Sequence, residues 1–436
     1  MSAKTEMNTL IDDMHATLDL LNAILEPKES EKKEYGEVFT PSWFAEVMLS
    51  TYPANMWSNP ASTFYDPAAG SGVFCVCVFY RLFDGLQHVI PDKIARKTHI
   101  LTNMLYMSEI GSKNVAILRH IFGPLANINH GDSLIFDAAA HWKIRPLDMH
   151  VIGNPPYNKE MSRSGACPLY NEFIEKYIDN CRTLRFVVPS RWFAGGKGLD
   201  KFRAMMLARK DIRSIHHIDD ASSVFGSGVS IKGGINYFVV ERGYVGDCDY
   251  NGTMINLSAL DILADSKYIG LVSKLALYPS ITDIYRGRCY GIETNDPRLT
   301  DDTSQVDCFV SKHKGRIRYI DASHIKKSFA EWKVITAEAA HKQGSGFGNI
   351  FVGSPDQVHT GSYISFGVAS ESEAINLVSY LRCKLPNKLL GLRKSSQHIN
   401  GNTCKWITLP PLDRTWTDAS VNEYYKLTAW EVALLD

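Results

Sequence analysis

The fold of this chain is decided by TFYDPAAGSG, residues Thr63–Gly72. The residues before Asp66 predict a short buried strand, and the apolar run after the glycines predicts a helix from about Ser71 to Leu86. Glycines at such a turn let the backbone approach a ligand closely, and the helix N-terminus presents free N–H groups. The stretch therefore predicts a strand–turn–helix unit with a ligand site at its turn.

The alternation of strand and helix continues to about Gly243. Further strands are predicted at 105–109, 148–153, 185–189, 212–218 and 236–241, and helices at 113–122, 170–181 and 201–209. This alternation is typical of an α/β fold with a parallel, Rossmann-like sheet that is covered on both faces. Because ligands of such sheets bind at the carboxyl ends of the strands, we expect Asp66, Glu109, Asp132 and Asn154 to surround one site.

Three segments are predicted along the chain. Residues 1–34 hold an amphipathic helix and a charged linker. The apolar stripe of this helix, from Met7 to Leu25, is expected to pack on the protein's own core, with a dimer contact as the alternative. Residues 35–250 hold the alternating region. In residues 251–436 the alternation fades and basic residues cluster, so we predict a separate mixed α/β domain there.

The composition is that of a folded protein without a global charge. Apolar residues make up 45% of the 436 residues, and 47 basic residues balance 47 acidic ones, so any nucleic-acid surface must be a local patch. No apolar run approaches the ~20 residues that span a bilayer, and no secretion signal is seen at the N-terminus. The nine cysteines lack CxxC spacing, which disfavours zinc ribbons and disulfides and indicates a reducing cytoplasm.

The glycine turn is unsuited to a phosphate. Cys75 stands where a G-x-G-x-x-G motif needs its third glycine, and no P-loop lysine follows. The Asp66 carboxylate would repel a phosphate but suits an ammonium, such as that of S-adenosylmethionine. Glu109 can accept hydrogen bonds from ribose hydroxyls, and Asp132 from an adenine amine. Each acid alone is also compatible with a solvated strand end or a helix cap.

The sharpest feature is the sequence Asn154-Pro155-Pro156-Tyr157, which follows an apolar strand. Two successive prolines form a rigid turn with fixed φ and no N–H. The Asn154 side-chain oxygen and the Pro155 carbonyl can therefore accept both hydrogens of one planar NH₂ group. This draws the nitrogen lone pair out of ring conjugation, and Tyr157 offers a π face for a base. The alternative is a proline-rich loop that merely ends a strand.

These residues together resemble the amino-group DNA methyltransferases, specifically the N6-adenine enzymes of the gamma motif order. The resemblance covers most of the chain. Gly36–Pro41 is similar to the N-terminal cofactor motif of that family, Asn154–Tyr157 matches its catalytic tetrapeptide, and Val187–Phe193 is similar to a later strand motif. The resemblance implies S-adenosyl-L-methionine as cofactor, held by Phe39, Thr40, Pro41, Asp66, Pro67, Ala68, Gly70, Glu109, Ile110, Asp132, Ser133 and Asn154.

The resemblance also implies a flipped adenine in double-stranded DNA as the substrate. Phe225 is similar to the aromatic that stacks on the extruded base opposite Tyr157, and 251–436 is similar to a target-recognition domain. Its predicted DNA contacts are Arg316, Arg318, Lys326, Lys327, Arg393, Lys394, Gln397 and His398. We expect a cytoplasmic monomer or homodimer of bacterial, phage or plasmid origin, with a cognate restriction endonuclease as a second partner and no metal or membrane.

Several alternatives stay open on the sequence. The Asn-Pro-Pro-Tyr motif is shared with protein-glutamine methyltransferases, and N4-cytosine or RNA methylation would use similar chemistry. A DNA-binding modification subunit of a restriction complex is a further alternative. Asp321, Glu331 and Lys333 have the loose spacing of a metal-dependent nuclease, a pattern that often occurs by chance.

Overall fold

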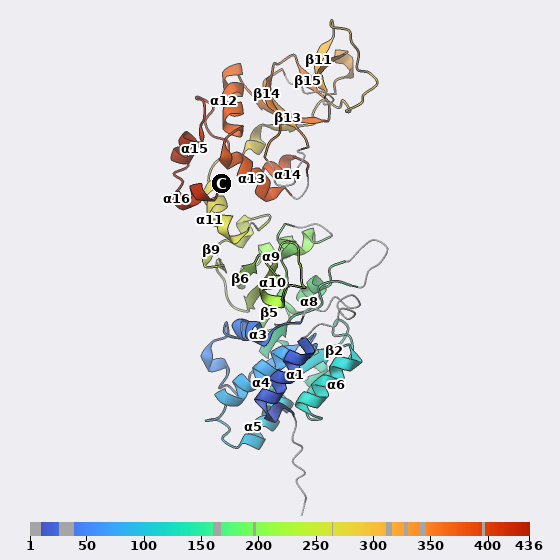
Figure 1. Cartoon of the computed structure of the whole chain (residues 1–436), viewed down its shortest axis with the longest axis vertical. Helices are drawn as coiled ribbons and strands as arrows, with labels where there is room; N and C mark the ends of the chain where they lie inside the picture. Colours follow the sequence, from blue (N-terminus) through green and yellow to red (C-terminus); the bar gives the residue numbers. More distant parts are fainter. Residues whose placement is uncertain are drawn as a thin grey trace, which may run out of the picture. The chain divides into compact units, whose positions relative to one another are not determined.

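The computed structural model describes residues 10–25, 39–159, 167–194, 198–263, 265–310, 316–326, 330–339, 346–394 and 397–436. The chain divides into two compact units, Met1–Ser266 and Lys267–Asp436 (Figure 1). The boundary between the two units thus lies after Ser266, C-terminal to the predicted domain boundary at residue 250. Residues 253–255 form the last strand of the first unit, which explains why 251–266 belong with it.

A nine-stranded sheet forms the centre of the first unit. Its strands lie in the order β3-β2-β1-β4-β5-β7-β6-β8-β9. The strands are β1 Thr63–Asp66, β2 Leu105–Glu109, β3 Asn127–His130, β4 Met149–Gly153, β5 Thr183–Pro189, β6 Ile212–Ile218, β7 Ile235–Glu241, β8 Cys248–Tyr250 and β9 Thr253–Ile255. The five strands from β3 to β5 are parallel, which confirms the expected Rossmann-like sheet.

The last predicted strand runs against its neighbours. β7 pairs antiparallel with both β5 and β6. The connection from β6 to β7 contains only the four-residue helix α10, Ser222–Phe225, whereas parallel neighbours normally need a longer crossover helix. The hydrophobic pattern predicted the position of this strand, but it carries no information about strand direction.

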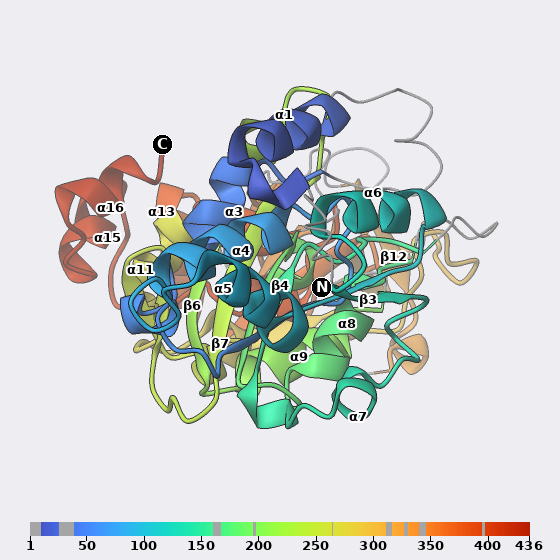
Figure 2. The ribbon, with the colours of Figure 1, turned by 90° about the horizontal axis from the view of Figure 1, so that it is seen from below.

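Helices cover both faces of the sheet. Figure 2 shows α4 and α6 on one side of the strands and α8 and α9 on the other. The helices of this unit are α1 Met14–Leu25, α3 Ser42–Leu49, α4 Val73–Gly85, α5 Lys93–His99, α6 Ser112–Phe122, α7 Ala138–Trp142, α8 Tyr170–Tyr177, α9 Asp200–Ala208 and α10. Because side chains alternate along a strand, Phe64 enters the α4 core while Tyr65 lies on the face of Tyr177.

The N-terminal helix packs on the protein's own core, as expected from its apolar stripe. Ile11 and Leu21 are buried in the same cluster as Phe44 and Phe79. The Tyr80 hydroxyl donates a hydrogen bond to the Ile11 carbonyl at 3.0 Å.

The second unit is mixed α/β, as predicted. A four-stranded antiparallel sheet has the order β10-β16-β13-β14, and a three-stranded sheet has the order β12-β11-β15. The strands are β10 Tyr285–Gly287, β11 Val306–Val310, β12 Arg316–Ile320, β13 Trp332–Ala337, β14 Ile350–Gly353, β15 Val358–His359 and β16 Tyr363–Val368. The helices are α11 Ser266–Leu275, α12 Glu371–Leu381, α13 Lys384–Arg393, α14 Gly401–Cys404, α15 Asp418–Tyr424 and α16 Ala429–Ala433.

All nine cysteines lie in the described ranges and are free thiols. Among the helices that the structure describes, none combines the length and apolarity needed to cross a membrane.

Candidate active site at the carboxyl edge of the sheet

The predicted glycine turn joins β1 to α4. Gly72 is the residue before α4 and has a φ of 96°, a conformation that glycine adopts without strain. A Cβ on Gly72 would also lie 2.7 Å from Leu118 Cδ2. The Ala69 N–H donates to the Ser108 carbonyl at 2.9 Å, which ties the turn to β2. The turn is therefore a preformed part of the sheet edge.

Glu109 links the turn to the next strand end. Its two carboxylate oxygens accept hydrogen bonds from the Gly70 N–H at 2.8 Å and the Gly111 N–H at 2.6 Å. The side chain is buried, while the following residue, Ile110, is 69% exposed. An acceptor and an exposed apolar side chain thus lie next to each other, a pairing that suits a ribose and an adenine ring.

Asp66 is the electrostatically unusual group of the site. It is 2% exposed, and its Oδ1 accepts a hydrogen bond from the Ala68 N–H at 3.0 Å. Burial is the main cause that raises its pKa to about 8, and the Glu109 charge raises it further, whereas the Ala68 N–H opposes the shift. A cation at this carboxyl would favour its ionised form.

The Asn154 corner directly adjoins Asp66. Gly153, the last residue of β4, packs so tightly against this carboxyl that an added Cβ would lie 2.6 Å from Asp66 Oδ1. The Asn154 Nδ2 group donates to Thr40 Oγ1 at 3.1 Å, so the amide oxygen of Asn154 faces away from Thr40. The predicted amine-binding corner, the Asp66 turn and Thr40 of the predicted N-terminal motif therefore meet at one place.

The corner itself is rigid and largely enclosed. Pro155 is buried, and Asn154 and Pro156 are half-buried. Tyr157 is 5% exposed, and burial is the main cause that raises the pKa of its hydroxyl. The Tyr157 carbonyl accepts a hydrogen bond from the Leu169 N–H at 3.0 Å, which holds the backbone after the corner.

Asp132 lies in the loop after β3. Its Oδ1 accepts from the Leu134 N–H at 2.8 Å, so it caps its own turn. Lys176, which the sequence analysis did not identify, donates to the carbonyls of Ser133, Leu134 and Phe136 at 2.6, 3.0 and 2.7 Å. One half-buried ammonium thus fixes the loop that carries the predicted adenine contacts. No local motif indicated this, because Lys176 comes from α8, about 40 residues further along the chain.

The remaining predicted residues of the first unit vary in their surroundings. Phe225 is half-buried, with its ring centroid 6.2 Å from that of Phe44, and its role on a base stays a prediction. Phe39 and Pro41 are half-buried, and Pro41 is the residue before α3. Residues 36–38 of the predicted N-terminal motif lie outside the described residues.

The predicted DNA contacts of the second unit are accessible to different degrees. Arg318 donates to the carbonyls of Leu299 and Thr300 at 3.0 Å each, and Arg393 lies over the Trp406 ring. Lys394 is 5% exposed, so it is poorly placed for a phosphate. Arg316 starts β12, whereas Lys326, Gln397 and His398 are exposed, and Lys327 lies outside the described residues.

The three residues of the nuclease alternative, Asp321, Glu331 and Lys333, have separate partners. Asp321 caps a short helix through the Ser323 N–H at 2.8 Å. Glu331 pairs with Arg286, and the buried Lys333 ammonium donates to the Ser354 and Gln357 carbonyls. Each of the three groups thus serves a separate local contact.

Two family models of DNA methylases match parts of the chain. Residues 19–175 match the model of the N-6 DNA Methylase family, and residues 135–225 match the Eco57I restriction-modification methylase family. A relative from Mycoplasma pneumoniae, described as an uncharacterized adenine-specific methylase, is 24% identical over 56% of this chain and 74% of its own length.

Two solved structures illustrate the similarity. A modification subunit of a putative type I restriction enzyme from Vibrio vulnificus aligns with a TM-score of 0.40 and 16% identity, over 54% of this chain and 51% of that chain. The type IIL restriction-modification enzyme MmeI, in complex with DNA, aligns with a TM-score of 0.45 and 12% identity, over 89% of this chain and 70% of that chain.

The sheet, the glycine turn after β1 and the Asn-Pro-Pro-Tyr corner together have the Rossmann-like arrangement that the sequence analysis predicted. By these family models and this relative, the chain is similar to the N6-adenine DNA methyltransferases of restriction-modification systems. The family match favours adenine N6 over the N4-cytosine, RNA and protein-glutamine alternatives.

Proposed function

We propose that this chain transfers a methyl group from S-adenosyl-L-methionine to the N6 amine of a flipped adenine at a specific sequence in duplex DNA. The observation that carries the proposal is the contact between Gly153 and the buried Asp66 carboxyl. This contact joins the corner that suits an NH₂ group to the turn that suits an ammonium. Donor and acceptor sites must be adjacent for direct transfer, since positioning supplies much of the rate.

The residues of the turn fit the cofactor. Asp66 is a buried carboxyl whose raised pKa falls back when a cation pairs with it. Asp66 would hold the ammonium, Glu109 the ribose, and Ile110 with Asp132 the adenine. When bound, S-adenosylmethionine supplies an electrophilic methyl group.

Asn154 and Pro155 would prepare the target amine. The Asn154 Oδ1 and the Pro155 carbonyl each accept one hydrogen of the amine, which turns the nitrogen lone pair out of the ring plane. The N6–CH₃ bond forms as the methyl–sulfur bond breaks, and the amine then loses one proton to solvent. Because the proton leaves only after alkylation, no strong base is required at this corner.

The base must leave the helix before it reaches the corner, at a cost of a few kcal/mol. Tyr157 and Phe225 are proposed to stack on its two faces. We further propose that Lys267–Asp436 is the target-recognition domain and that the protein works in the cytoplasm beside a cognate restriction endonuclease. Its free thiols are compatible with that compartment.

The test is Asn154→Ala in the purified full chain. Removing one oriented polar group from a reacting centre typically costs about 10²–10³-fold in rate. We expect a loss of that size in methyl transfer to DNA, with cofactor affinity largely kept. Asn103→Ala is the matched control, because Asn103 is exposed and bonds only to the neighbouring His99 and Thr102 side chains in the described contacts.

Mass analysis of nucleosides completes this experiment. N6-methyladenine in DNA from wild-type reactions, absent with Asn154→Ala, supports the proposal. Full activity of Asn154→Ala, or a product other than N6-methyladenine, would overturn it.

A further inference from the structure

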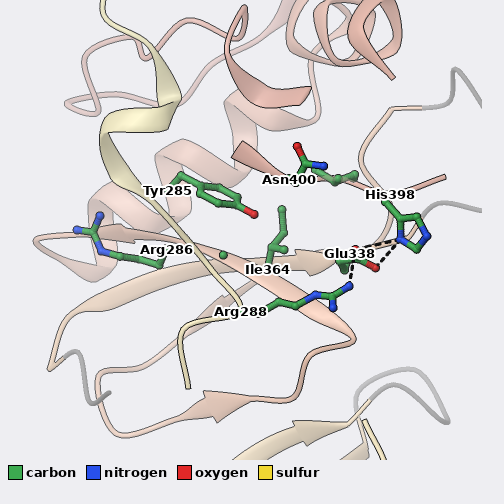
Figure 3. A pocket seen from close by; sticks show the side chains of 9 residues that line it. Tyr285, Arg286, Arg288, Glu338, Ile364, His398 and Asn400 are labelled. Atoms are coloured by element: carbon green, nitrogen blue, oxygen red, sulfur yellow. Dashed lines mark hydrogen bonds and ion pairs between the residues drawn. The ribbon is translucent and has the colours of Figure 1, made fainter. Parts of the chain in front are cut away.

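The second unit contains a cavity of about 720 Å³ that none of the proposed steps uses. Figure 3 shows its lining, which includes Tyr285, Arg288, Glu338, Ile364, His398 and Asn400. Ile364 lies between the polar side chains, and two basic groups are directed at the Glu338 carboxylate. An apolar floor with a few oriented polar groups is the composition of a specific ligand site.

Glu338 holds two of these side chains at once. Its Oε1 lies 2.5 Å from Arg288 Nη2, and both of its oxygens lie 3.0 Å from His398 Nδ1. The Glu338 side chain is 12% exposed, whereas those of Arg288 and His398 are 53% and 50% exposed. A largely buried carboxylate therefore orients two groups that reach the surface.

The backbone around Glu338 is fixed on both sides. Its N–H donates to the Ser362 carbonyl at 2.9 Å, and its carbonyl accepts from the Ile399 N–H at 2.7 Å. The neighbouring Ala339 and His398 form an isolated antiparallel bridge. The carboxylate is thus held in place before any ligand arrives, which is what precise recognition requires.

The two oriented groups differ in hydrogen-bonding character. The Arg288 guanidinium is a planar fork of donors. The carboxylate can only accept, so His398 Nδ1 must carry a proton toward it. His398 therefore holds the Glu338 carboxylate, and the cavity offers the donors of Arg288.

A planar fork of donors is complementary to one base. In the major groove guanine shows two acceptors, N7 and O6. We propose that Arg288, oriented by Glu338, which His398 also holds, reads the guanine of a G·C pair in the major groove of the DNA target. The inference rests on the proposed function and assigns specificity residues to it. The sequence analysis identified His398 but missed Arg288 and Glu338.

A contact with the DNA backbone is less favourable at this site. A phosphate is attracted mainly by net positive charge. The Glu338 carboxylate neutralises Arg288 and would repel a phosphate at the same place, but it leaves the orientation of the guanidinium intact. The arrangement therefore weakens sequence-independent attraction and keeps directional hydrogen bonds.

The experiment compares the wild type with Arg288→Gln, Arg288→Lys and His398→Ala in the full chain. Arg414→Gln is the control, since Arg414 forms an exposed pair with Asp413 in the same unit. Long-read modification sequencing of DNA from expressing cells gives the methylated motif of each variant. Methylation rates on oligonucleotides with that G·C pair replaced by A·T then measure discrimination at the position.

We expect a wild-type preference for the G·C pair of about tenfold to a hundredfold, the range of one good base contact. Arg288→Gln and His398→Ala should relax the same single position, and Arg288→Lys should lose most of the preference because it lacks the planar fork. On oligonucleotides in which A·T replaces that G·C pair, the methylation rates of the variants should differ little from that of the wild type. Arg414→Gln should keep the wild-type motif.

Three results would overturn the inference alone. The first is an unchanged methylated motif in the Arg288 and His398 variants. The second is a loss of methylation rate in Arg288→Gln that is equal on every oligonucleotide and that is absent in Arg288→Lys. The third is a wild-type motif without a fixed G·C pair. The second of these would indicate a phosphate contact. A wild-type chain that methylates no motif would instead overturn the proposed function, and the inference with it.

Discussion

Asp66→Asn should remove the pH dependence of cofactor binding. Asp66 is 2% exposed, and burial with the nearby Glu109 charge raises its pKa from 3.8 to about 8. In the free protein near pH 6 the carboxyl is therefore mostly protonated, whereas a bound ammonium favours the carboxylate. Cofactor binding below pH 8 must then release a proton, so the association constant should rise about tenfold per pH unit between about pH 6 and 7.

Isothermal titration calorimetry in two buffers of different ionisation enthalpy measures this proton directly. We expect nearly one proton released per cofactor bound near pH 6.5 by the wild type, and none by Asp66→Asn, which should also bind more weakly. Asp92→Asn is a matched control, because Asp92 is an exposed helix cap. Wild-type affinity that is constant over this pH range, or equal proton release by Asp66→Asn, would refute the reasoning.

The same pKa shift acts on the stability of the cofactor-free protein. The pKa of Asp66 is higher in the folded state than in the unfolded state, so folding favours its protonated form. This contribution to stability is fully present below about pH 4 and is lost as the pH rises through about 8. Thermal unfolding of the wild type should therefore shift to lower temperature over this range, more than that of Asp66→Asn. Parallel curves for the two proteins would contradict it.

Two further predictions concern neighbouring contacts. Gly153→Ala places a Cβ 2.6 Å from Asp66 Oδ1. Because a displacement of about 1 Å at a reacting centre can lower the rate about 10²-fold, the single-turnover methylation rate should fall by that order. An unchanged rate would show that the corner tolerates movement. Lys176→Met removes the donor to the Ser133, Leu134 and Phe136 carbonyls. It should lower the melting temperature and raise the KM for cofactor more than it lowers kcat, and a melting temperature equal to that of the wild type would rule out the clamp.

Most of the catalytic unit follows from local sequence patterns. The strands that carry Asp66, Glu109 and Asn154 end where the apolar runs end, and the glycine turn after Asp66 begins α4 as expected. These features depend on hydrophobic spacing and on turn residues a few positions apart, and both patterns are visible in the sequence alone. The Asn-Pro-Pro-Tyr corner is likewise a local structure, since proline sets its own backbone angle.

Other features depend on contacts between distant segments, and only the tertiary structure decided them. The direction of β7, the packing of Gly153 on Asp66, the burial of Lys394 and the meeting of Arg288 with Glu338 have no signature in local spacing. Glu338 and His398 are 60 residues apart in the chain, yet one carboxylate binds both His398 and Arg288. The sequence by itself therefore determined which elements form and where the reacting groups stand along them. Only the folded chain determined which charged groups meet, because that depends on how all elements pack at once.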